Sequence, residues 1–245
     1  MKIIAVYCSK GGVGKTATSV NLAYTAARQG YATLLCDLDP QGASSYYFRI
    51  RPKKKFNSKK LLNAKLQNYI RGTDFDDLDL LPAHFSHRNM DVMLDREATS
   101  SKYLHDVLQS QEGQYDLIIL DSPPNLTLLS ENIIAAADMV LTPIIPTTLS
   151  ILSLEQLLKL FKKTGADKSK VHAFFSMVER RKNMHMSIMS KYQKYTLFMN
   201  TVIPYLAEVE KMGVTRMPVG AGRTSNAALA YTRLWKEVEH RGQLR

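Results

Sequence analysis

The sequence is poor in cysteine and contains no long apolar run. Only two of its 245 residues are cysteines, Cys8 and Cys36. This is too few for a disulfide framework or a paired metal-binding motif, which favours a reduced, cytoplasmic setting. Each follows an apolar run, so we expect both on buried strands. No run approaches the roughly 20 apolar residues needed to cross a bilayer, and Met1 leads into a strand-like segment rather than a signal peptide.

Acidic residues are also in short supply. The chain has 33 Lys and Arg against 22 Asp and Glu, a net charge of +11, which indicates a polyanionic partner, either nucleic acid or an anionic membrane surface. The segment 49–60, RIRPKKKFNSKK, holds seven basic residues and no acidic one. Because Pro52, Asn57 and Ser58 disfavour a long regular element, we expect an exposed loop that interrupts a single domain spanning 1–245.

Short apolar runs alternate with helix-length amphipathic segments. Strands are predicted over 2–8, 31–37, 78–82, 115–121, 138–145, 170–178 and 201–204, and helices at about 16–29, 60–71, 99–112, 150–164, 184–195 and 224–240. Gly30 stands where a helix C-cap is expected. The alternation predicts an α/β fold with a doubly wound, mostly parallel sheet and helices on both faces. Ligands of such sheets bind beyond the carboxyl ends of the strands.

The segment SKGGVGKT, residues 9–16, links the first predicted strand to the first predicted helix. Its glycines, Gly11, Gly12 and Gly14, allow backbone N–H groups to turn toward an anion without interference from a Cβ. The amino end of the helix adds its partial positive charge. We therefore predict a phosphate-binding loop, or P-loop, at this position.

The side chains of this loop extend the prediction and depart from the general pattern. Lys15 is placed to bind the β- and γ-phosphates of a nucleotide, and Thr16 to ligate Mg²⁺. Ser9 stands where the general P-loop has its first glycine, so the match is to a deviant form, KGGxGK[ST]. That form carries a second lysine, Lys10, which the phosphate loop of one subunit does not require.

Aspartates follow two other predicted strands. Asp37 and Asp39 lie in CDLDPQG, and Asp121 lies in LIILDSPP. A hydrophobic strand that ends in aspartate is how P-loop enzymes hold Mg²⁺ and its waters. Either segment alone is a weak signal, because aspartates also cap helices and turns, but the three segments in this order predict a nucleotide site.

These segments resemble the ParA/MinD group of deviant Walker ATPases, and most closely the ParA partition ATPases. The resemblance covers almost the whole chain, including SKGGVGKTATSVNLA, LLCDLDPQGASS, YDLIILDSPPN, FFSMVERRKNMH, and TVIPYLAEVEKMG through AALAYTRLWKEV. It implies ATP and Mg²⁺ as cofactors, an ATP sandwich homodimer, slow ATP hydrolysis, and non-specific DNA binding by the dimer. It also implies that a cargo is positioned over the nucleoid and that a ParB-like or other small adaptor stimulates the ATPase.

The same resemblance gives roles to the site residues. Lys15 would bind its own nucleotide, whereas Lys10 would contact the phosphates held by the other subunit. Asp39 would position the attacking water. Mg²⁺ would be bound directly by Thr16, and through water by Asp37 and Asp121. The implied nucleotide contacts are Gly11, Gly12, Val13, Gly14, Lys15, Thr16, Ala17 and Pro204, the last in the adenine pocket. Ala17 departs from the family, which often has threonine there to contact the α-phosphate.

DNA contacts are expected in the C-terminal part of the chain, at Lys211, Arg216 and above all Arg223. Another arginine of the family aligns near Glu208, so the pattern departs there. Within 49–60, Lys53, Lys54 and Lys55 could compensate as a second phosphate-contacting element, and a solvated loop is the other interpretation. The sequence leaves open whether Arg180, Arg181 and Lys182 face the nucleotide, the dimer interface or DNA.

Other members of the same fold provide the alternatives. A MinD-like membrane-cycling ATPase would need a C-terminal amphipathic tail, and after Val238 the sequence has only EHRGQLR. We therefore expect no stable membrane association and a cytoplasmic, nucleoid-associated protein. An iron–sulfur carrier would need cysteines at the dimer interface. A tyrosine kinase of the Walker type would need a tyrosine-rich tail, and 232–245 contains no tyrosine.

Overall fold

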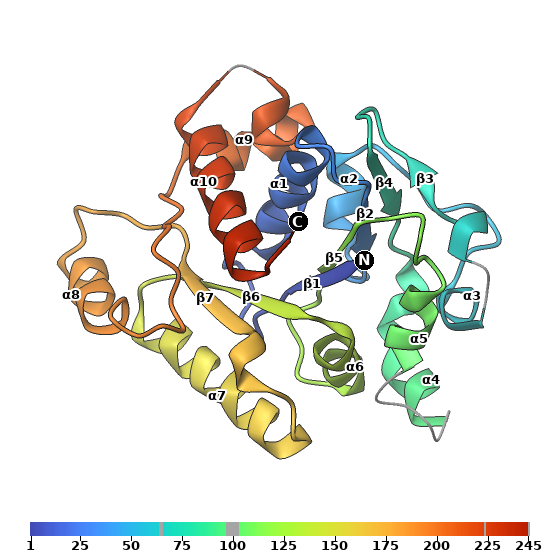
Figure 1. The fold of residues 1–245 in the computed structure, drawn as a ribbon, viewed down its shortest axis with the longest axis horizontal. Helices are drawn as coiled ribbons and strands as arrows, with labels where there is room; N and C mark the ends of the chain where they lie inside the picture. Colours follow the sequence, from blue (N-terminus) through green and yellow to red (C-terminus); the bar gives the residue numbers. More distant parts are fainter. Residues whose placement is uncertain (64–65, 97–102, 223, 245) are drawn as a thin grey trace.

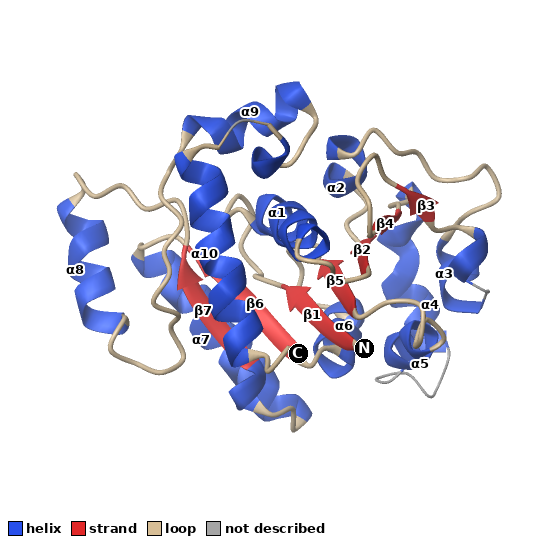
Figure 2. Ribbon diagram, turned by 45° about the horizontal axis from the view of Figure 1, so that its top comes forward, coloured by secondary structure: helices blue, strands red, loops and turns tan. Residues whose placement is uncertain are grey.

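The computed structural model describes residues 1–63, 66–96, 103–222 and 224–244. A seven-stranded sheet runs through it in the order β3-β4-β2-β5-β1-β6-β7 (Figures 1 and 2). Neighbouring strands are parallel except for the antiparallel pair β3 and β4. The strands are β1 (Lys2–Val6), β2 (Thr33–Asp37), β3 (Arg71–Gly72), β4 (Leu78–Leu81), β5 (Leu117–Asp121), β6 (Met139–Ile144) and β7 (Val171–Phe175). The predicted doubly wound α/β fold is confirmed.

Helices cover both faces of the sheet. One face carries α1 (Lys15–Arg28), α2 (Ala43–Tyr47), α9 (Ala207–Thr215) and α10 (Asn226–Arg241), and the other carries α4 (Met90–Arg96), α5 (Tyr103–Gln109), α6 (Leu128–Ala136) and α7 (Thr148–Thr164) (Figure 1). At opposite ends of the molecule lie α8 (Asn183–Tyr192) and α3 (Ser58–Asn63). Short 3₁₀ turns occupy Leu66–Asn68, Phe85–Asn89, Lys168–Lys170 and Val219–Ala221. Within the described residues, no helix is long and apolar enough to cross a membrane.

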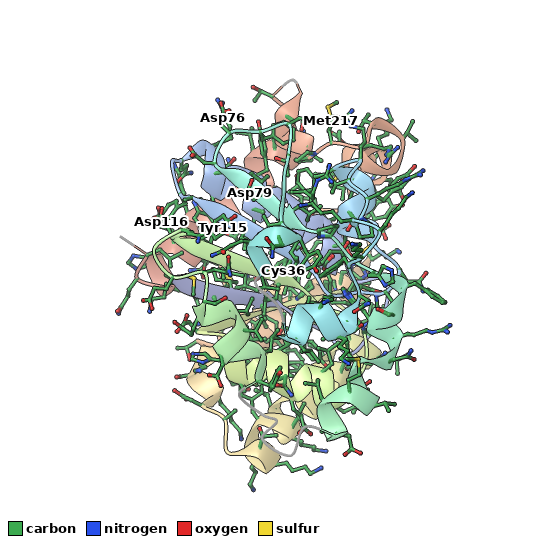
Figure 3. All side chains as sticks on the ribbon, turned by 90° about the vertical axis from the view of Figure 1, so that its right-hand side faces the viewer. Cys36, Asp76, Asp79, Tyr115, Asp116 and Met217 are labelled. Carbon is green, nitrogen blue, oxygen red and sulfur yellow. The ribbon has the colours of Figure 1, made fainter. Side chains whose placement is uncertain are left out.

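Alternating side chains divide the core into two layers. On β1, Ile3 and Ala5 belong to one buried cluster, whereas Ile4 and Val6 belong to the cluster on the opposite face. This is the period of two expected of a strand buried on both sides. Just before β5, the Tyr115 hydroxyl donates to Asp79 Oδ2 of β4 at 2.6 Å, and both residues are labelled in Figure 3.

Both cysteines are buried, but only one is on a strand. Cys36 lies within β2, whereas Cys8 lies two residues beyond the end of β1. The predicted C-cap is also present, because Gly30 follows α1 with a φ of 85°. That left-handed conformation favours glycine.

Two predicted elements differ from the structure. Residues 201–204 form no regular strand, although Ile203 N donates to the Phe175 carbonyl of β7 at 2.8 Å. The backbone N–H groups of Asn200 and Thr201 donate instead to the Glu237 carboxylate, at 2.7 and 2.8 Å, which breaks the ladder. The helix predicted at 60–71 is divided into α3, a 3₁₀ turn and β3. Of the helix predicted at 99–112, residues 99–102 lie outside the described part of the chain.

The basic segment 49–60 is more firmly held than a free loop. Phe56 is 1% exposed and packs against Tyr69, His84 and His87. The last part of the segment forms the start of α3 rather than a loop. Its lysines therefore project from an excursion that is anchored by one aromatic side chain.

Candidate nucleotide-binding site

The predicted phosphate loop lies between β1 and α1, at the carboxyl edge of the sheet. Gly12 and Gly14 have φ values of 71° and 90°, a region that L side chains rarely adopt. A Cβ on Gly14 would also lie 3.2 Å from Ser176 Oγ. Gly11 and Gly12 face open space, so their backbone is accessible to an anion from outside.

The two lysines of the loop point in different directions. Lys15 is buried, and its Nζ donates to the Lys10 carbonyl at 3.0 Å. Burial lowers the pKa of Lys15, and the negative charges of Asp121 and Asp39 partly oppose that change. Lys10 is half-buried and its Nζ donates to Ser150 Oγ, 3.2 Å away in the first turn of α7. Lys15 is thus close enough to interact with the charges of Asp121 and Asp39, whereas the hydrogen bond of Lys10 is to α7.

Two of the predicted aspartates are fully buried side by side. Asp37 ends β2 and Asp121 ends β5, and they are register partners in the sheet. The Ser45 backbone N–H and hydroxyl each donate to Asp37 Oδ2 at 2.7 Å. Ser44 donates to Asp121 Oδ2 at 2.7 Å. The first turn of α2 therefore holds both carboxylates.

The amino end of α1 also contacts Asp121. Ser19 Oγ donates to Asp121 Oδ1 at 3.1 Å, and the nearby Thr16 hydroxyl opposes the rise that burial causes in the pKa of the same carboxylate. The amino end of α1 and Asp121 are thereby brought together beside the P-loop, and their expected roles toward Mg²⁺ stay a prediction.

The electrostatics of the carboxylate pair fit a cation. Burial raises the pKa of both Asp37 and Asp121, and for Asp37 the neighbouring charge of Asp121 raises it further. Asp37 Oδ1 is buried without any hydrogen-bond partner, although such atoms are nearly always paired in native proteins. Among the described residues, no group of three or more His, Cys, Asp or Glu forms a metal cage. Mg²⁺ needs no such cage, because it keeps waters and binds substrate phosphates.

Asp39 lies beside this pair and is more accessible. It is half-buried, and its Oδ1 accepts the Gln41 backbone N–H at 2.9 Å. The chain then turns at Gly42, which has a φ of 67°, into α2. Asp39 is thus held just beyond the end of β2 and is less buried than Asp37 and Asp121.

Pro204 borders a cavity of its own. The cavity has a volume of about 510 Å³, and its charged lining residues are Arg180 and Arg233. None of the P-loop residues lines that cavity. The expected role of Pro204 in an adenine pocket stays a prediction.

Ala17 is buried at the start of α1.

The basic residues expected to contact DNA differ in their surroundings. Lys211 is exposed on α9. Arg216 is half-buried, its Nε donates to the Tyr46 carbonyl at 3.0 Å, and its guanidinium lies 4.4 Å from the centre of the Tyr46 ring. Arg223 lies outside the described residues.

Within the basic excursion, Lys53 Nζ donates to the Asn68 carbonyl at 2.5 Å. Lys54 and Lys55 are exposed. Of the three lysines expected to contact DNA here, one therefore has a backbone partner in its own chain.

Sequence reasoning missed the serines that hold the carboxylates. Ser19, Ser44 and Ser45 carry no charge, and although they lie within the segments that resemble the family, the resemblance assigned them no role. Their signal is positional, because Ser44 and Ser45 come shortly after the Gly42 turn that follows the second strand's aspartates. A short helix beginning there places its first hydroxyls next to the strand ends.

This fold and loop define a nucleotide-binding protein of the P-loop class. A family model described as "AAA domain" matches residues 1–172, and the chain belongs to that family. It is also 30% identical to the sporulation initiation inhibitor protein Soj of Bacillus subtilis over 98% of this chain and 99% of the relative. The chain is therefore a member of the ParA-type partition ATPases.

Two solved structures have the same fold. Cobyrinic acid a,c-diamide synthase from Mycobacterium smegmatis, with bound ATP analog and magnesium, is 25% identical with a TM-score of 0.84, over 98% of this chain and 95% of that one. A putative plasmid partition protein from Borrelia burgdorferi, bound to AMPPNP, is 20% identical with a TM-score of 0.84, over 98% of each chain. The first shows that this fold also serves a different chemistry.

Proposed function

We propose that this protein is a Mg²⁺-dependent ATPase that forms an ATP sandwich homodimer, binds DNA without sequence preference in that state, and positions a cargo. The observation that carries the proposal is the arrangement of the two lysines. Lys15 interacts with the charges of Asp121 and Asp39, and Lys10 donates to Ser150 of α7 instead. A single bound nucleotide gives Lys15 a partner and leaves Lys10 available to a second subunit.

Cofactor binding is supported by the donor set at the strand ends. The P-loop backbone and Lys15 would hold the phosphates, and Thr16, Asp37 and Asp121 would hold Mg²⁺, the carboxylates through water. Mg²⁺ supplies charge neutralisation for the phosphate oxygens. The unpartnered Asp37 Oδ1 and the raised pKa of both aspartates favour a compensating cation at this position.

Hydrolysis in this site requires positioning more than covalent chemistry. Asp39 is anchored through the Gln41 N–H and is more accessible than the buried Asp37 and Asp121, so its carboxylate would be free to orient a water molecule toward the terminal phosphate. Lys15, and Lys10 from the partner subunit, would stabilise the negative charge that develops on the phosphate oxygens. A missing partner lysine would make hydrolysis slow.

Dimerisation is supported by an apolar surface next to Lys10. A groove of about 660 Å³ is lined by Lys10, Pro124 and three leucines, together with five uncharged polar residues. The leucines are Leu126, Leu149 and Leu152, which are 47%, 65% and 45% exposed. Large apolar side chains that gather on one exposed surface are typical of a protein interface, and this one borders the predicted cross-subunit lysine.

The wider role follows from the family and from the charge. The net charge of +11 favours DNA as the partner, with Lys211, Arg223 and Lys53–Lys55 as expected contacts. Arg216 would contribute less, because Tyr46 already holds its guanidinium. A ParB-like or other small adaptor protein would stimulate hydrolysis and release the dimer from the nucleoid. The adaptor would determine whether the cargo is a plasmid, a chromosome or a protein assembly.

Lys10→Ala tests the central claim. The variant should bind ATP as a monomer, because Lys15 and the loop backbone are intact, but should form less dimer and hydrolyse ATP at least about tenfold more slowly. Size-exclusion chromatography with ATP and a phosphate-release assay measure the two effects. Hydrolysis at the parental rate would refute the cross-subunit role. Parental protein that ignores DNA but sediments with anionic vesicles would favour a MinD-like membrane cycle instead.

A further inference from the structure

A row of exposed side chains lies on the helical segment that follows β4. Phe85 begins the 3₁₀ turn Phe85–Asn89, which runs directly into α4. At 62% exposure it is the most exposed aromatic side chain that the structure describes, and Val92 is 56% exposed. The guanidinium carbon of Arg88 lies 4.1 Å from the centre of the Phe85 ring. Spacings of three and four residues place Phe85, Arg88 and Val92 on one side of the segment, and we call them the α4 row.

Positive charge borders this row. Lys59 and Lys60 are exposed on α3. That helix is joined to the 3₁₀ turn, because the Ser58 backbone N–H donates to Ser86 Oγ at 2.9 Å. Among the residues that the structure describes, neither the two lysines nor Arg88 forms an ion pair. Three cations are therefore available to a partner next to two exposed apolar side chains.

The acidic residues of α4 leave this charge largely uncompensated. Asp91 Oδ1 accepts the Leu129 backbone N–H of α6 at 2.9 Å, so this carboxylate is already engaged. Asp95 is exposed near the end of α4, about one turn beyond Val92. The neighbouring segment 49–60 contributes no acid. The surface around the α4 row thus keeps an excess of positive charge.

The turn that presents Phe85 is fixed by its neighbours. His84 Nδ1 accepts the Ser86 backbone N–H at 3.1 Å, which caps the turn. From the side of the basic excursion, the buried Phe56 ring packs against His84 and His87. Phe85 therefore stands out from a firm base, and a partner that covers it would lose little binding energy to the ordering of this surface.

The same turn is connected to the nucleotide edge through Ala83, two residues before Phe85. The Ala83 backbone N–H donates to Ser45 Oγ at 2.9 Å, and that hydroxyl donates to Asp37 Oδ2 at 2.7 Å. A Cβ on Gly42 would lie 3.5 Å from the Ala83 Cβ, so Ala83 also lies against the turn that begins α2. A partner that shifts the 3₁₀ turn can therefore change the position of Asp37.

We propose that the α4 row and the two lysines of α3 dock an acidic segment of the adaptor protein, and that docking there changes ATP hydrolysis through the connection from Ala83 to Asp37. The inference rests on the proposed function and specifies how its adaptor is recognised. Large apolar side chains that stand out from a surface mark interaction sites, and a few of them supply most of the binding energy. The segment that fits carries bulky apolar side chains flanked by aspartate or glutamate.

The chemistry of the row favours a protein segment over nucleic acid. One face of the Phe85 ring is already covered by Arg88, which leaves less of the ring for stacking on a base. Val92 has no flat ring, and a phosphodiester backbone has no apolar group to cover it. Aromatic residues and arginine are instead enriched at protein interfaces, and the carboxylates of an acidic segment would complement the bordering cations.

The binding test uses a labelled synthetic peptide of about five helical turns, with leucine at every third or fourth position and glutamate elsewhere. Phe85→Gln removes the exposed ring. Tyr195→Gln is the matched control, because Tyr195 is 52% exposed and lies beside Lys194 as Phe85 lies beside Arg88. By fluorescence anisotropy, Phe85→Gln should bind the peptide about tenfold more weakly than the parent. Tyr195→Gln should stay within about twofold of the parent.

The charge of the surface is tested by Lys59→Gln with Lys60→Gln. This double variant should bind the peptide about threefold more weakly near 0.1 M salt, and its affinity should depend less on salt than that of the parent. Equal salt dependence in the two proteins would show that the lysines of α3 do not take part in docking.

The connection to Asp37 is tested at equilibrium, because coupling between two sites is reciprocal. The affinity of the parent for the peptide should differ at least about threefold between saturating Mg-ATP and nucleotide-free conditions. Ser45→Ala removes the hydroxyl that joins Ala83 to Asp37 and should abolish this difference, whereas Ser45→Thr keeps the hydroxyl and should retain it. The peptide should also change the rate of phosphate release by the parent but not by Phe85→Gln. Equal affinities in the parent, or a full difference in Ser45→Ala, overturn this route.

The remaining outcomes separate this inference from the proposed function. Failure of the parent to bind the peptide, or equal binding by Phe85→Gln and the parent, overturns the inference and leaves ATP hydrolysis and DNA binding in place. A parent that binds the peptide but neither hydrolyses Mg-ATP nor binds a duplex overturns the proposed function instead. If Phe85→Gln loses duplex binding or the ATP-dependent dimer, the surface belongs to nucleic acid or to a second copy, and the inference is wrong. Unchanged thermal midpoints show that the variants remain folded.

Discussion

At the carboxyl edge of the sheet, charged groups are buried and each has a defined neighbour, whereas on the basic surfaces they lie in solvent with few fixed partners. Asp37 is held by Ser45 and Asp121 by Ser44 and Ser19. Lys54 and Arg181, by contrast, are exposed. A buried charge interacts strongly and specifically because water is excluded. An exposed charge contributes through a collective, salt-dependent attraction. Substitutions at the nucleotide edge should therefore produce large, local effects, and those on the surfaces small, additive ones.

The largest expected effect belongs to Lys15. Lys15→Ala should weaken ATP binding at least about 100-fold, since removing a buried charged partner of a phosphate costs about 3 kcal/mol. DNA binding should disappear as well, because the DNA-binding dimer depends on ATP. Calorimetry with ATP and a duplex-binding assay measure both effects. Tight ATP binding by this variant would exclude the P-loop assignment, and DNA binding that survives without ATP would show that the surfaces act independently of the nucleotide edge.

The same contrast explains which features the sequence could predict. The P-loop and the strand-end aspartates could be located because each combines an apolar run with a charged or glycine-rich end. The serines of α2 could not, because their role depends on the angle at which a five-residue helix leaves the Gly42 turn. Phe56 was also missed within 49–60, because one aromatic among seven basic residues gives no periodic pattern. For Arg216, charge alone could not reveal that Tyr46 holds its guanidinium.

The basic excursion should respond to acid through His87. This side chain is 2% exposed and packs against Phe56, and burial lowers the pKa of His87 from 6.5 to about 4. Because the folded state disfavours the protonated ring, its contribution to stability is complete above pH 6.5. As pH falls toward 4, the unfolded state takes up a proton that the folded state refuses, and the free energy of unfolding decreases. The decrease reaches at most about 3 kcal/mol, since each pKa unit corresponds to about 1.4 kcal/mol.

Comparison with a variant isolates this contribution from other acid effects. His87→Leu should unfold with a weaker pH dependence than the parent between pH 6.5 and 4, as measured by urea denaturation. An identical pH dependence in the two proteins would show that His87 titrates normally and that the excursion is less firmly packed than the contacts indicate.

At the nucleotide edge, the expected pH effect has the opposite sign. Burial raises the pKa of Asp37, so the ionised form destabilises the nucleotide-free protein above the ordinary aspartate pKa, and protonation relieves the cost as pH falls. Asp37→Asn should thus increase the free energy of unfolding at pH 7 by about 1 kcal/mol, while weakening Mg²⁺-dependent ATP binding. Thermal unfolding without nucleotide, followed by titration with Mg-ATP, checks both. A destabilised variant would mean that the negative charge is already compensated in the free protein.

The smallest effect is expected where the two regions meet, at Arg216. Tyr46 follows directly after Ser44 and Ser45, and its hydroxyl donates to the Gly213 carbonyl of α9 at 3.1 Å. Arg216 donates back to the Tyr46 carbonyl at 3.0 Å. The helix that holds Asp37 and Asp121 is therefore fastened to α9, which carries Lys211. Because its guanidinium is already occupied, Arg216→Ala should change duplex affinity less than about twofold and leave the salt slope nearly unchanged.

Lys211→Ala is the matched comparison, since this side chain is exposed on the same helix. It should lower the salt slope by about 0.9 for each phosphate that it contacts and leave ATP hydrolysis without DNA unaltered. Arg216→Ala should instead reduce that hydrolysis about two- to threefold, because it removes a hydrogen bond that contributes about 0.5–1 kcal/mol to the placement of α2. If Arg216→Ala lowered the log–log salt slope of duplex binding by about 0.9 and left hydrolysis unchanged, Arg216 would belong to the DNA surface. The α2–α9 contact would then have no role in joining the two regions.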